Sequence, residues 1–549
     1  MSMQDLLSNR RDFLKLTSAM AGAAVMPRIL SMPSAHAQAG STIVIAAPAT
    51  PQSLDCNFDV SLGTFEAIAA LYDGLLGFAK IPDAGVPSAL REDTAFYADK
   101  PGNVNMVGKL AESWELDPSG KRAVFKLRQG VKSNWGNELT AEDVRWTWNR
   151  AFELGALGAF YTAVSGLKSP ADIRVEDKYV VSFNTEDPNP LLLKIHTNLY
   201  TPVYDSTKCK EMGGTDDPWA RKFIENESAG FGPYRLQQLT RGQQAVFTAR
   251  EDYYGGKPAI DTVVFKEVPT SASRVQLLQG GAVDIAQYLQ PLEIISLKNA
   301  PNVAVETVPA SFMIWIELNA KIAPFDNVDV RRAMNYAFPQ EEVLKAVYQG
   351  LASPLNGCMP NIYPGFTGDH YNYQYNLDKA KELLAKAGVN GFKTSLAYNA
   401  GDPVQEPIAI IYQSALKNIG IEVELQKVPA GSFYNFVTDR KQPMIFYVDS
   451  PWCPDPGYSL TLYFDSKSYV NYSNYANAEV DKLLADAAAT ADEALRIDLT
   501  QKAQAIIMDE APWTFVAYPN YTMARKADLK GWTYYTSNNI RFQDFSRDA

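Results

Sequence analysis

The side chains best suited to recognise a charged organic molecule lie in one short stretch of the chain. Residues 447–458 read YVDSPWCPDPGY, so that Asp449 and Asp455 flank Trp452. A carboxylate beside aromatic rings attracts an ammonium or guanidinium group, because the ring faces add a cation–π attraction to the ion pair. Asp455 directly precedes Pro456, which makes turn formation the alternative role of that carboxylate. The stretch therefore predicts a site that recognises a positively charged group.

Aromatic residues are abundant in the rest of the chain as well. They make up 11% of the sequence and include 29 tyrosines and 9 tryptophans. Tyr and Trp combine an apolar ring with a polar group, which suits a pocket for a sizeable organic molecule. Core and hinge packing is the alternative role, so we expect the aromatic residues to divide between a pocket and the core.

The sequence lacks the patterns that support common catalytic sites. It contains no GxSxG, HExxH or P-loop pattern, and only His196 and His370 follow the N-terminal His36. The four cysteines form no CxxC pair, which argues against a zinc knuckle, and they allow three disulfide pairings that sequence cannot distinguish. We therefore expect no catalytic residue, no metal and no cofactor, although a periplasmic enzyme stays an alternative.

Length and composition indicate a multidomain globular protein. A chain of 549 residues exceeds what one core usually organises, so we expect two or three domains. Hydrophobic residues make up 46% and charged residues 21%, which is ordinary for a globular protein. The net charge of −11 argues against nucleic acid or an anionic membrane as a partner. No apolar run after the N-terminal segment is long enough to span a bilayer.

The N-terminal segment resembles a bacterial twin-arginine export signal. Arg10 and Arg11 precede Phe-Leu-Lys at 13–15, and residues 16–26 are small and weakly apolar. Ala-His-Ala at 35–37 fits a cleavage site. We expect residues 1–37 to be removed, leaving a freely diffusing periplasmic protein that folds before export; an ordinary amphipathic helix is the alternative.

Strands and helices alternate through the remaining chain, which predicts an α/β fold. The predicted strands are 44–47, 123–127, 180–183, 245–248, 262–266 and 421–425, and the predicted helices are 65–76, 141–144 onward, 271–278, 330–338, 378–387, 407–419 and two within 478–508. Thr140 and Asp143 predict a capping box at the start of the second helix. Residues 209–219, rich in Gly, Asp and Pro, predict a surface loop or a domain boundary.

Several segments resemble a known family when taken together. Residues 110–150 contain Ala-x-Ser-Trp, Phe-x-Leu-Arg and Leu-Thr-Ala-Glu-Asp-Val, and the further segments are ALYDGLL (70–76), GFGPYR (230–235), EDYYGGKPAID (251–261), LLQGGAVDIA (277–286) and PFDNVDVRRAMNYAF (324–338). In this order they resemble the extracytoplasmic solute-binding proteins of the peptide/nickel type, family 5, which are the receptors of ABC importers.

The resemblance implies a two-lobed periplasmic binding protein fold with a hinge and an extra domain in lobe one. Lobe one would comprise 38–81, 196–310 and 515–549, the extra domain 82–195, and lobe two 311–514. The implied partners are a small organic solute, captured by hinge closure, and the permease and ATPase subunits of the importer. The receptor itself would be a monomer.

The family's binding motif is altered in this chain. Peptide-binding members have Trp-x-x-Asp-x-x-Asp-Pro, whose first Asp pairs with the amino terminus of the ligand. Here Trp452 stands at that position and Asp449 stands at the position of the motif's Trp, as if the two had exchanged places. The arginine that grips the carboxylate of a dipeptide is also missing near Asn399, which argues against an ordinary dipeptide.

A longer peptide, an opine-like conjugate and a sugar-like solute stay open as ligands, and a nickel chelate or haem is the alternative within the family. Asn319 aligns with a strand that crosses to lobe two, and we expect it to fix the hinge. The predicted ligand-binding residues are Trp452, Asp449, Tyr447, Asp455, Tyr458, Asn399, Trp315, Phe312 and Ser53.

Overall fold

The computed structural model describes residues 42–59, 61, 63–97 and 99–547. The predicted export signal, residues 1–37, lies outside the described residues. None of the described helices combines the length and apolarity needed to cross a bilayer.

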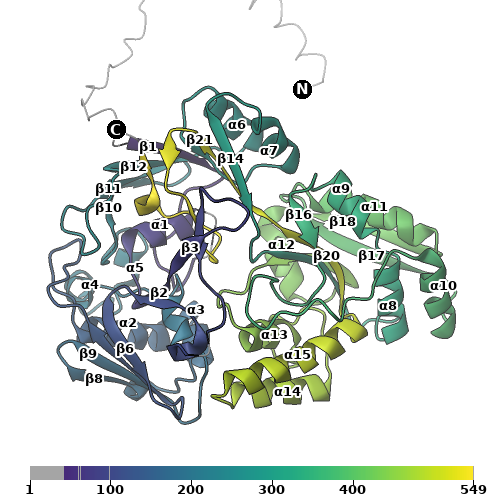
Figure 1. The fold of residues 1–549 in the computed structure, drawn as a ribbon, viewed down its shortest axis with the longest axis horizontal. Coiled ribbons are helices and arrows are strands. Elements are labelled where there is room, and N and C mark those ends of the chain that lie inside the picture. Colours follow the sequence, from purple (N-terminus) through teal and green to yellow (C-terminus); the bar gives the residue numbers. More distant parts are fainter. Residues whose placement is uncertain (1–41, 60, 62, 98, 548–549) are drawn as a thin grey trace, which may run out of the picture. The chain divides into compact units, whose positions relative to one another are not determined.

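The sheet of lobe one is built from distant parts of the chain (Figure 1). Its strand order is β10 (Tyr234–Thr240), β11 (Gln244–Ala249), β12 (Thr262–Glu267), β1 (Thr42–Ala47), β13 (Ile285–Ala286), β21 (Tyr521–Lys526) and β14 (Val303–Val308). Alternate residues of β1 face opposite sides, as a strand requires. Ile43 and Ile45 join the core that contains Ile68 of α1 (Thr64–Leu71). Ala46 joins the core that contains α6 (Ser271–Gln279) and α7 (Pro291–Leu297).

The extra domain consists of a four-stranded antiparallel sheet and two helices. The sheet order is β6 (Ala111–Leu116), β7 (Arg122–Leu127), β9 (Val180–Asn184) and β8 (Ile173–Asp177), and the helices are α2 (Ala141–Leu154) and α3 (Leu157–Val164). The predicted capping box of α2 is confirmed, because the backbone N–H of Thr140 donates to Asp143 Oδ2 at 2.7 Å.

The predicted loop at 209–219 is wrong at its start, since Asp205 caps helix α4 (Ser206–Gly213). Helix α5 (Arg221–Ile224) follows.

Short strands tie the C-terminal segment to the beginning of lobe one, and their pairing places Leu90–Glu92 in lobe one although the sequence assigned them to the extra domain. Strand β23 (Thr533–Tyr534) pairs in parallel with β4 (Leu90–Glu92), which pairs with β3 (Lys80–Pro82). Two further pairs are β2 (Leu76–Phe78) with β5 (Met106–Gly108) and β22 (Leu529–Lys530) with β24 (Ser546–Arg547). The pairing of β23 with β4 brings residues 536–541 beside Glu92, at the edge of lobe one that faces lobe two.

Lobe two contains a mixed sheet covered on both faces by helices. Its strand order is β16 (Ala352–Pro354), β20 (Trp513–Pro519), β15 (Met313–Leu318), β19 (Met444–Asp449), β17 (Phe392–Asn399) and β18 (Ile421–Val428). One core includes residues of α8 (Val328–Tyr336), α10 (Leu377–Lys386) and α11 (Gln405–Lys417). The other includes residues of α13 (Pro456–Phe464), α14 (Ala478–Ala488) and α15 (Glu493–Glu510). Helices α9 (Gln340–Ala346) and α12 (Ala430–Thr438) complete the lobe.

Two neighbouring chain segments cross between the lobes (Figure 1). Residues 309–312 join β14 to β15, and Asn520 joins β20 to β21. The strands on either side of each crossing are antiparallel neighbours. Because β20 pairs with β15, residues 515–519 belong to the sheet of lobe two, whereas the sequence placed them in lobe one.

The hinge role predicted for Asn319 does not fit its position. It lies at the end of β15 that is remote from the crossing, and its Nδ2 donates to the carbonyl oxygens of Arg440 (2.9 Å) and Gln442 (3.0 Å). Asn319 therefore fixes a loop within lobe two.

The four cysteines are buried and free, so none of the three disulfide pairings forms. The Sγ of Cys56 lies 2.9 Å from the hydroxyl oxygen of Tyr204.

Candidate solute-binding site

A cavity of about 170 Å³ lies between the two lobes. Lobe two contributes residues from the crossing segment, the end of β19 and the loop after it, and lobe one contributes residues from its beginning, its middle and its C-terminal segment. The lining includes Phe65, Phe78, Glu92, Asn198, Tyr200, Tyr288, Phe312, Asp449, Ser450, Trp452, Asn538 and Arg541. Three of the predicted site residues, Phe312, Asp449 and Trp452, thus meet at one cavity.

Asp449 supplies a carboxylate at the end of β19. Its side chain is half-buried, and its Oδ1 accepts a hydrogen bond from the backbone N–H of Ser450 at 2.7 Å. Burial raises the pKa of Asp449 to about 6, against the opposing effect of that hydrogen bond. Within the described part of the chain, no lysine, arginine or histidine forms an ion pair with Asp449. The carboxylate is therefore available to a cation that enters the cavity.

Trp452 forms an aromatic wall with rings that come from the other side of the cleft. Its ring centroid lies 5.1 Å from that of Tyr200, 6.0 Å from that of Tyr161 and 6.2 Å from that of Phe160. Its carbonyl oxygen accepts a hydrogen bond from Asn198 Nδ2 at 3.1 Å. These contacts join lobe two to the extra domain and to lobe one, so the cleft is closed around Trp452.

Lobe one places a guanidinium and a second carboxylate in the same cavity. Arg541 lies over the ring of Tyr535, with 3.9 Å between the guanidinium carbon and the ring centroid, and its Nη2 lies 4.0 Å from Glu92 Oε1. The other oxygen of Glu92 accepts hydrogen bonds from the backbone N–H and the hydroxyl of Thr536, at 2.9 and 2.8 Å. Sequence reasoning missed both residues, because no local pattern in Asn-Ile-Arg-Phe or Leu-Arg-Glu links positions 449 residues apart.

A hydrogen-bonded cluster beside the cavity connects the lobes at the crossing segment. The hydroxyls of Ser311 and Ser450 are 2.6 Å apart, and Asn538 Nδ2 donates to both, at 2.8 and 3.0 Å. Tyr534 accepts a hydrogen bond from the backbone N–H of Ser311 at 2.8 Å. All four side chains are buried, so the cluster holds the C-terminal segment against lobe two.

Asp455 is part of a buried charge cluster and does not reach the cavity. Its carboxylate caps α13 by accepting from the backbone N–H of Tyr458 at 2.9 Å, and it pairs with Arg496 and with Lys194 Nζ at 2.8 Å. Glu493 lies 3.2 Å from Lys194 and 3.3 Å from Arg496. Burial acts to raise the pKa of Asp455, but the two cations lower it below its usual range. We therefore leave Asp455 out of the proposed site.

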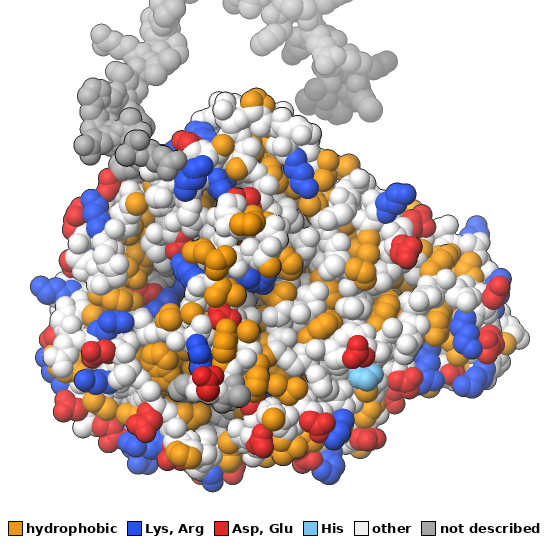
Figure 2. Space-filling model, viewed as in Figure 1, with side chains coloured by type: hydrophobic (Ala, Val, Ile, Leu, Met, Phe, Trp, Pro, Cys, Tyr) orange, Lys and Arg blue, Asp and Glu red, His pale blue; other side chains and the backbone are white. Residues whose placement is uncertain are grey.

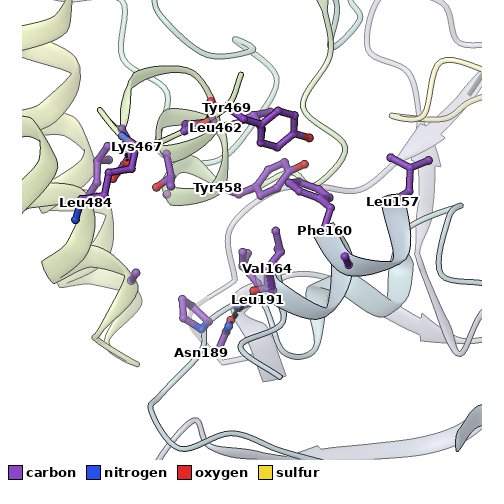
Figure 3. A pocket seen from close by; sticks show the side chains of 18 of the residues that line it. Leu157, Phe160, Val164, Asn189, Leu191, Tyr458, Leu462, Lys467, Tyr469 and Leu484 are labelled. Carbon is purple, nitrogen blue, oxygen red and sulfur yellow. Dashed lines mark hydrogen bonds between the residues drawn. The ribbon is translucent and has the colours of Figure 1, made fainter. Parts of the chain in front are cut away.

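A larger cavity of about 1050 Å³ lies on the other side of the aromatic wall (Figure 3). Helix α3 of the extra domain presents Phe160 and Val164 to it, and lobe two presents Tyr458, Leu462 and Tyr469. The remaining lining is mostly apolar and includes Ala156, Ala159, Ala163, Leu191, Leu484 and Ala488, with Asn189, Asp465 and Lys467 among its polar members. The predicted site residue Tyr458 thus lines the larger cavity, 6.3 Å from Phe160 between ring centroids.

The remaining predicted residues lie away from both cavities. Trp315 is fully buried in the core of lobe two, where it stacks on Trp513 with 4.1 Å between ring centroids, and we leave it out of the proposed site. Tyr447 packs against Trp315 and Tyr472. Asn399 and Ser53 accept hydrogen bonds from backbone N–H groups of their own loops, those of Gly401 (2.8 Å) and Asp55 (3.1 Å). None of these four side chains lines either of the two cavities.

The surface agrees with a protein whose ligand binds in its interior. On the face shown in Figure 2, acidic and basic side chains are interspersed around the edge, and hydrophobic side chains gather near the middle. No extended area of one charge covers this face.

Two lobes joined by paired crossings, with a cavity between them, define a two-lobed solute-binding protein. Comparison with known proteins identifies the family. Residues 105–471 match the model described as bacterial extracellular solute-binding proteins, family 5 Middle. The chain therefore belongs to family 5 of the bacterial extracellular solute-binding proteins, which are receptors and not enzymes.

Individual proteins resemble the chain over nearly its whole length. The probable D,D-dipeptide-binding periplasmic protein DdpA of Escherichia coli is 28% identical over 92% of this chain and 94% of that protein. Heme-binding protein A of Haemophilus influenzae is 25% identical over 80% of this chain and 86% of that protein. The Helicobacter pylori periplasmic binding protein DppA, solved with the peptide STSA, has a TM-score of 0.77 and 24% identity over 93% of this chain and 98% of its own.

Proposed function

We propose that this receptor captures a peptide-like solute in the cavity between its lobes and that Asp449 binds a positively charged group of that solute. The observation that carries the proposal is a half-buried carboxylate that faces a cavity and has no cationic partner among the described residues. A carboxylate that loses part of its hydration is favourable only when a charged or hydrogen-bonding partner replaces the water. An ammonium group of the solute supplies that partner.

Trp452 supports the same assignment through its ring. It lines the cavity beside Asp449, and an aromatic face next to a carboxylate adds a cation–π attraction to the ion pair. The exchange of Asp and Trp relative to the family motif thus leaves both groups at one cavity. The proposal thus keeps an amine-binding carboxylate but places it at Asp449, three residues before the position that it occupies in the family motif.

The chemistry of the cavity favours a peptide over the other solute classes. A sugar-like solute offers no cation to Asp449, whereas the free amino terminus of a peptide does. The similarity to a dipeptide-binding relative agrees with this choice. The haem alternative gains no support from the histidines, because neither His196 nor His370 lines either cavity. His196 packs instead against Phe125 in the core.

The larger cavity accommodates the apolar remainder of the solute in this proposal. Trp452 contacts Tyr200 at the smaller cavity and Phe160 at the larger one, so this wall separates the cavities. The proposal therefore requires its rings to move apart when a solute whose charged end lies at Asp449 extends into the larger cavity. A volume of about 1050 Å³ is at the upper end of the range for small-molecule sites. A solute larger than a simple dipeptide is thereby favoured.

The proposal also covers the export of the receptor, the movement of its lobes and its partner in the membrane. The twin-arginine pattern at Arg10 and Arg11 directs the folded receptor out of the cytoplasm. Rotation about the crossing segments 309–312 and 520 opens and closes the cleft, and the closed, loaded form meets the permease of an ABC importer as a monomer.

The test is calorimetry with a set of free peptides of two to five residues. Asp449→Asn is expected to weaken binding of a peptide with a free amino terminus about ten- to hundredfold, because it removes a charge-assisted interaction. Asp439→Asn is the matched control, since Asp439 lies exposed in lobe two beside Lys441 and lines neither cavity. Equal affinities of the two variants would remove Asp449 from the site.

A further inference from the structure

The guanidinium of Arg541 is buried without hydrogen bonds. Only 7% of the residue is exposed. A guanidinium carries five N–H donors, and its burial is costly unless they are satisfied. No residue in the described part of the chain accepts a hydrogen bond from Arg541, and its buried Nε has no partner there. Its nearest ionic neighbour, Glu92 Oε1, lies 4.0 Å from Nη2, beyond hydrogen-bonding distance.

The other buried arginines in the described part of the chain donate hydrogen bonds, which sets Arg541 apart. Arg150 donates four hydrogen bonds, to the side chains of Asp55 and Asn57 and to the carbonyl oxygen of Trp219. Arg274 also donates four, all to backbone carbonyl oxygens. Arg150 and Arg274, whose roles are structural, thus receive acceptors from the fold itself.

Glu92 does not satisfy Arg541, because the chain holds Glu92 elsewhere. Two hydrogen bonds from Thr536 fix its Oε2. The ring of Tyr535 covers one face of the guanidinium. The donors of Arg541 are thus left for the cavity that Arg541, Glu92 and Asn538 line together.

We infer that Arg541 is an anion-binding residue of this cavity and that the solute carries a carboxylate in addition to its cationic group. The inference rests on the proposed function and specifies its substrate class as a zwitterion, such as a peptide with a free carboxyl terminus. A carboxylate in the plane of the guanidinium accepts two parallel N–H···O bonds, which satisfies the orphaned donors. The cation missing near Asn399 is in this way supplied from lobe one.

The positions of the two charges explain how such a solute closes the cleft. Asp449 belongs to lobe two and Arg541 to lobe one. A solute with one charge at each end bonds to both lobes only when they are closed. It therefore has a higher affinity for the closed form and shifts the population toward it.

The test compares peptides with their carboxyl-terminal amides on the wild-type protein by calorimetry. The acid is expected to bind about ten- to hundredfold more tightly than the amide, because the amide removes a charge-assisted bidentate pair. Arg541→Gln is expected to lower the affinity for the acid to that for the amide. The affinity for the amide should stay within about twofold of its wild-type value. Arg91→Gln is the matched control and keeps the preference, since Arg91 pairs with Asp83 and does not line the cavity.

Equal affinity of acid and amide for the wild-type protein would overturn the inference without any variant, so a misfolded Arg541→Gln does not obscure the result. A second outcome is that Asp449→Asn loses binding of both acid and amide while the wild type binds the two equally. This result would exclude Arg541 as an anion-binding residue and would still support the proposed function. If no peptide binds in either form, the peptide class fails. The anion-binding role of Arg541 is then tested on the solute released from protein purified from its host. A solute with an anionic group supports this role, and a solute without one overturns it.

Discussion

In the proposed function, Asp449 is the side chain whose charge decides what the cavity between the lobes can hold. Because burial raises its pKa to about 6, Asp449 is largely ionised near pH 7.5 and largely neutral near pH 5. Only the ionised form attracts an ammonium group. The affinity for a free peptide is therefore expected to fall about tenfold from pH 7.5 to pH 5, as measured by calorimetry.

Asp449→Asn serves as the control for this pH dependence, because Glu92 and Arg541 line the same cavity and are retained in the variant. The variant should show a weak affinity with little pH dependence over this range. If the variant keeps the tenfold decrease, the titrating group lies elsewhere.

Lys194 is the residue that tests the buried charge cluster between the extra domain and lobe two. Lys194→Met leaves Asp455 and Glu493 with one cation, Arg496, and breaking a buried pair of this kind costs about 3–5 kcal/mol in the free energy of unfolding. Urea denaturation measures the loss. Lys482→Met, which removes an exposed pair with Asp486 on α14, should cost at most about 1 kcal/mol. Similar losses in both variants would show that the cluster contributes no more than a surface pair.

At the scale of secondary structure, the large cavity depends on the apolar face of α3 and on the helices opposite it. Helix α14 offers a matched pair of exposed alanines, of which Ala488 lines the cavity and Ala485 does not. Ala488→Trp is expected to reduce affinity about tenfold for peptides with a large apolar side chain and to leave the smallest peptides unaffected, because the new ring occupies part of the cavity. Calorimetry with both peptide classes measures this. Ala485→Trp should bind both classes as the wild type does, and a matching decrease there would point to a general effect on lobe two.

Helices and strands with strong local signals were predictable from the sequence. The capping box at Thr140, the helix at 378–387 and the strand at 421–425 all appear close to their predicted bounds, because periodicity and caps are local properties. The helix that begins at Ser206 was missed, since its Gly-rich end resembles a loop. The lobe boundary near 515 was misplaced, because the strand pairing that assigns β20 to lobe two is not visible in one segment.

The candidate site was predictable only in part, because local patterns are visible in the sequence and long-range contacts are not. Asp449 and Trp452 belong to one short stretch with a recognisable composition. Arg541 and Glu92 come together through the pairing of β23 with β4, which joins segments more than 400 residues apart in the sequence. Asp455 and Trp315 carry suitable side chains, but tertiary packing buries both, and burial cannot be read from residue type.

At the scale of the whole molecule, the proposed export signal is expected to decide where the receptor works. Replacing both Arg10 and Arg11 by lysine is expected to abolish export of the full-length chain, because the twin-arginine pair is the recognised element of such a signal. Fractionation of cells should then find the protein in the cytoplasm with residues 1–37 attached. The paired control replaces Lys15 by arginine, which keeps the charge and the pair. Undiminished export of the double variant would exclude the twin-arginine route.

The central claim is that the two lobes close on a solute held between Asp449 and the ring of Trp452. A crystal structure of the protein with its bound solute tests this most directly. We expect electron density for an unaltered guest in the interlobe cavity, with a cationic group within hydrogen-bonding distance of Asp449. A guest bound outside this cavity, or one chemically converted by the protein, would contradict the account.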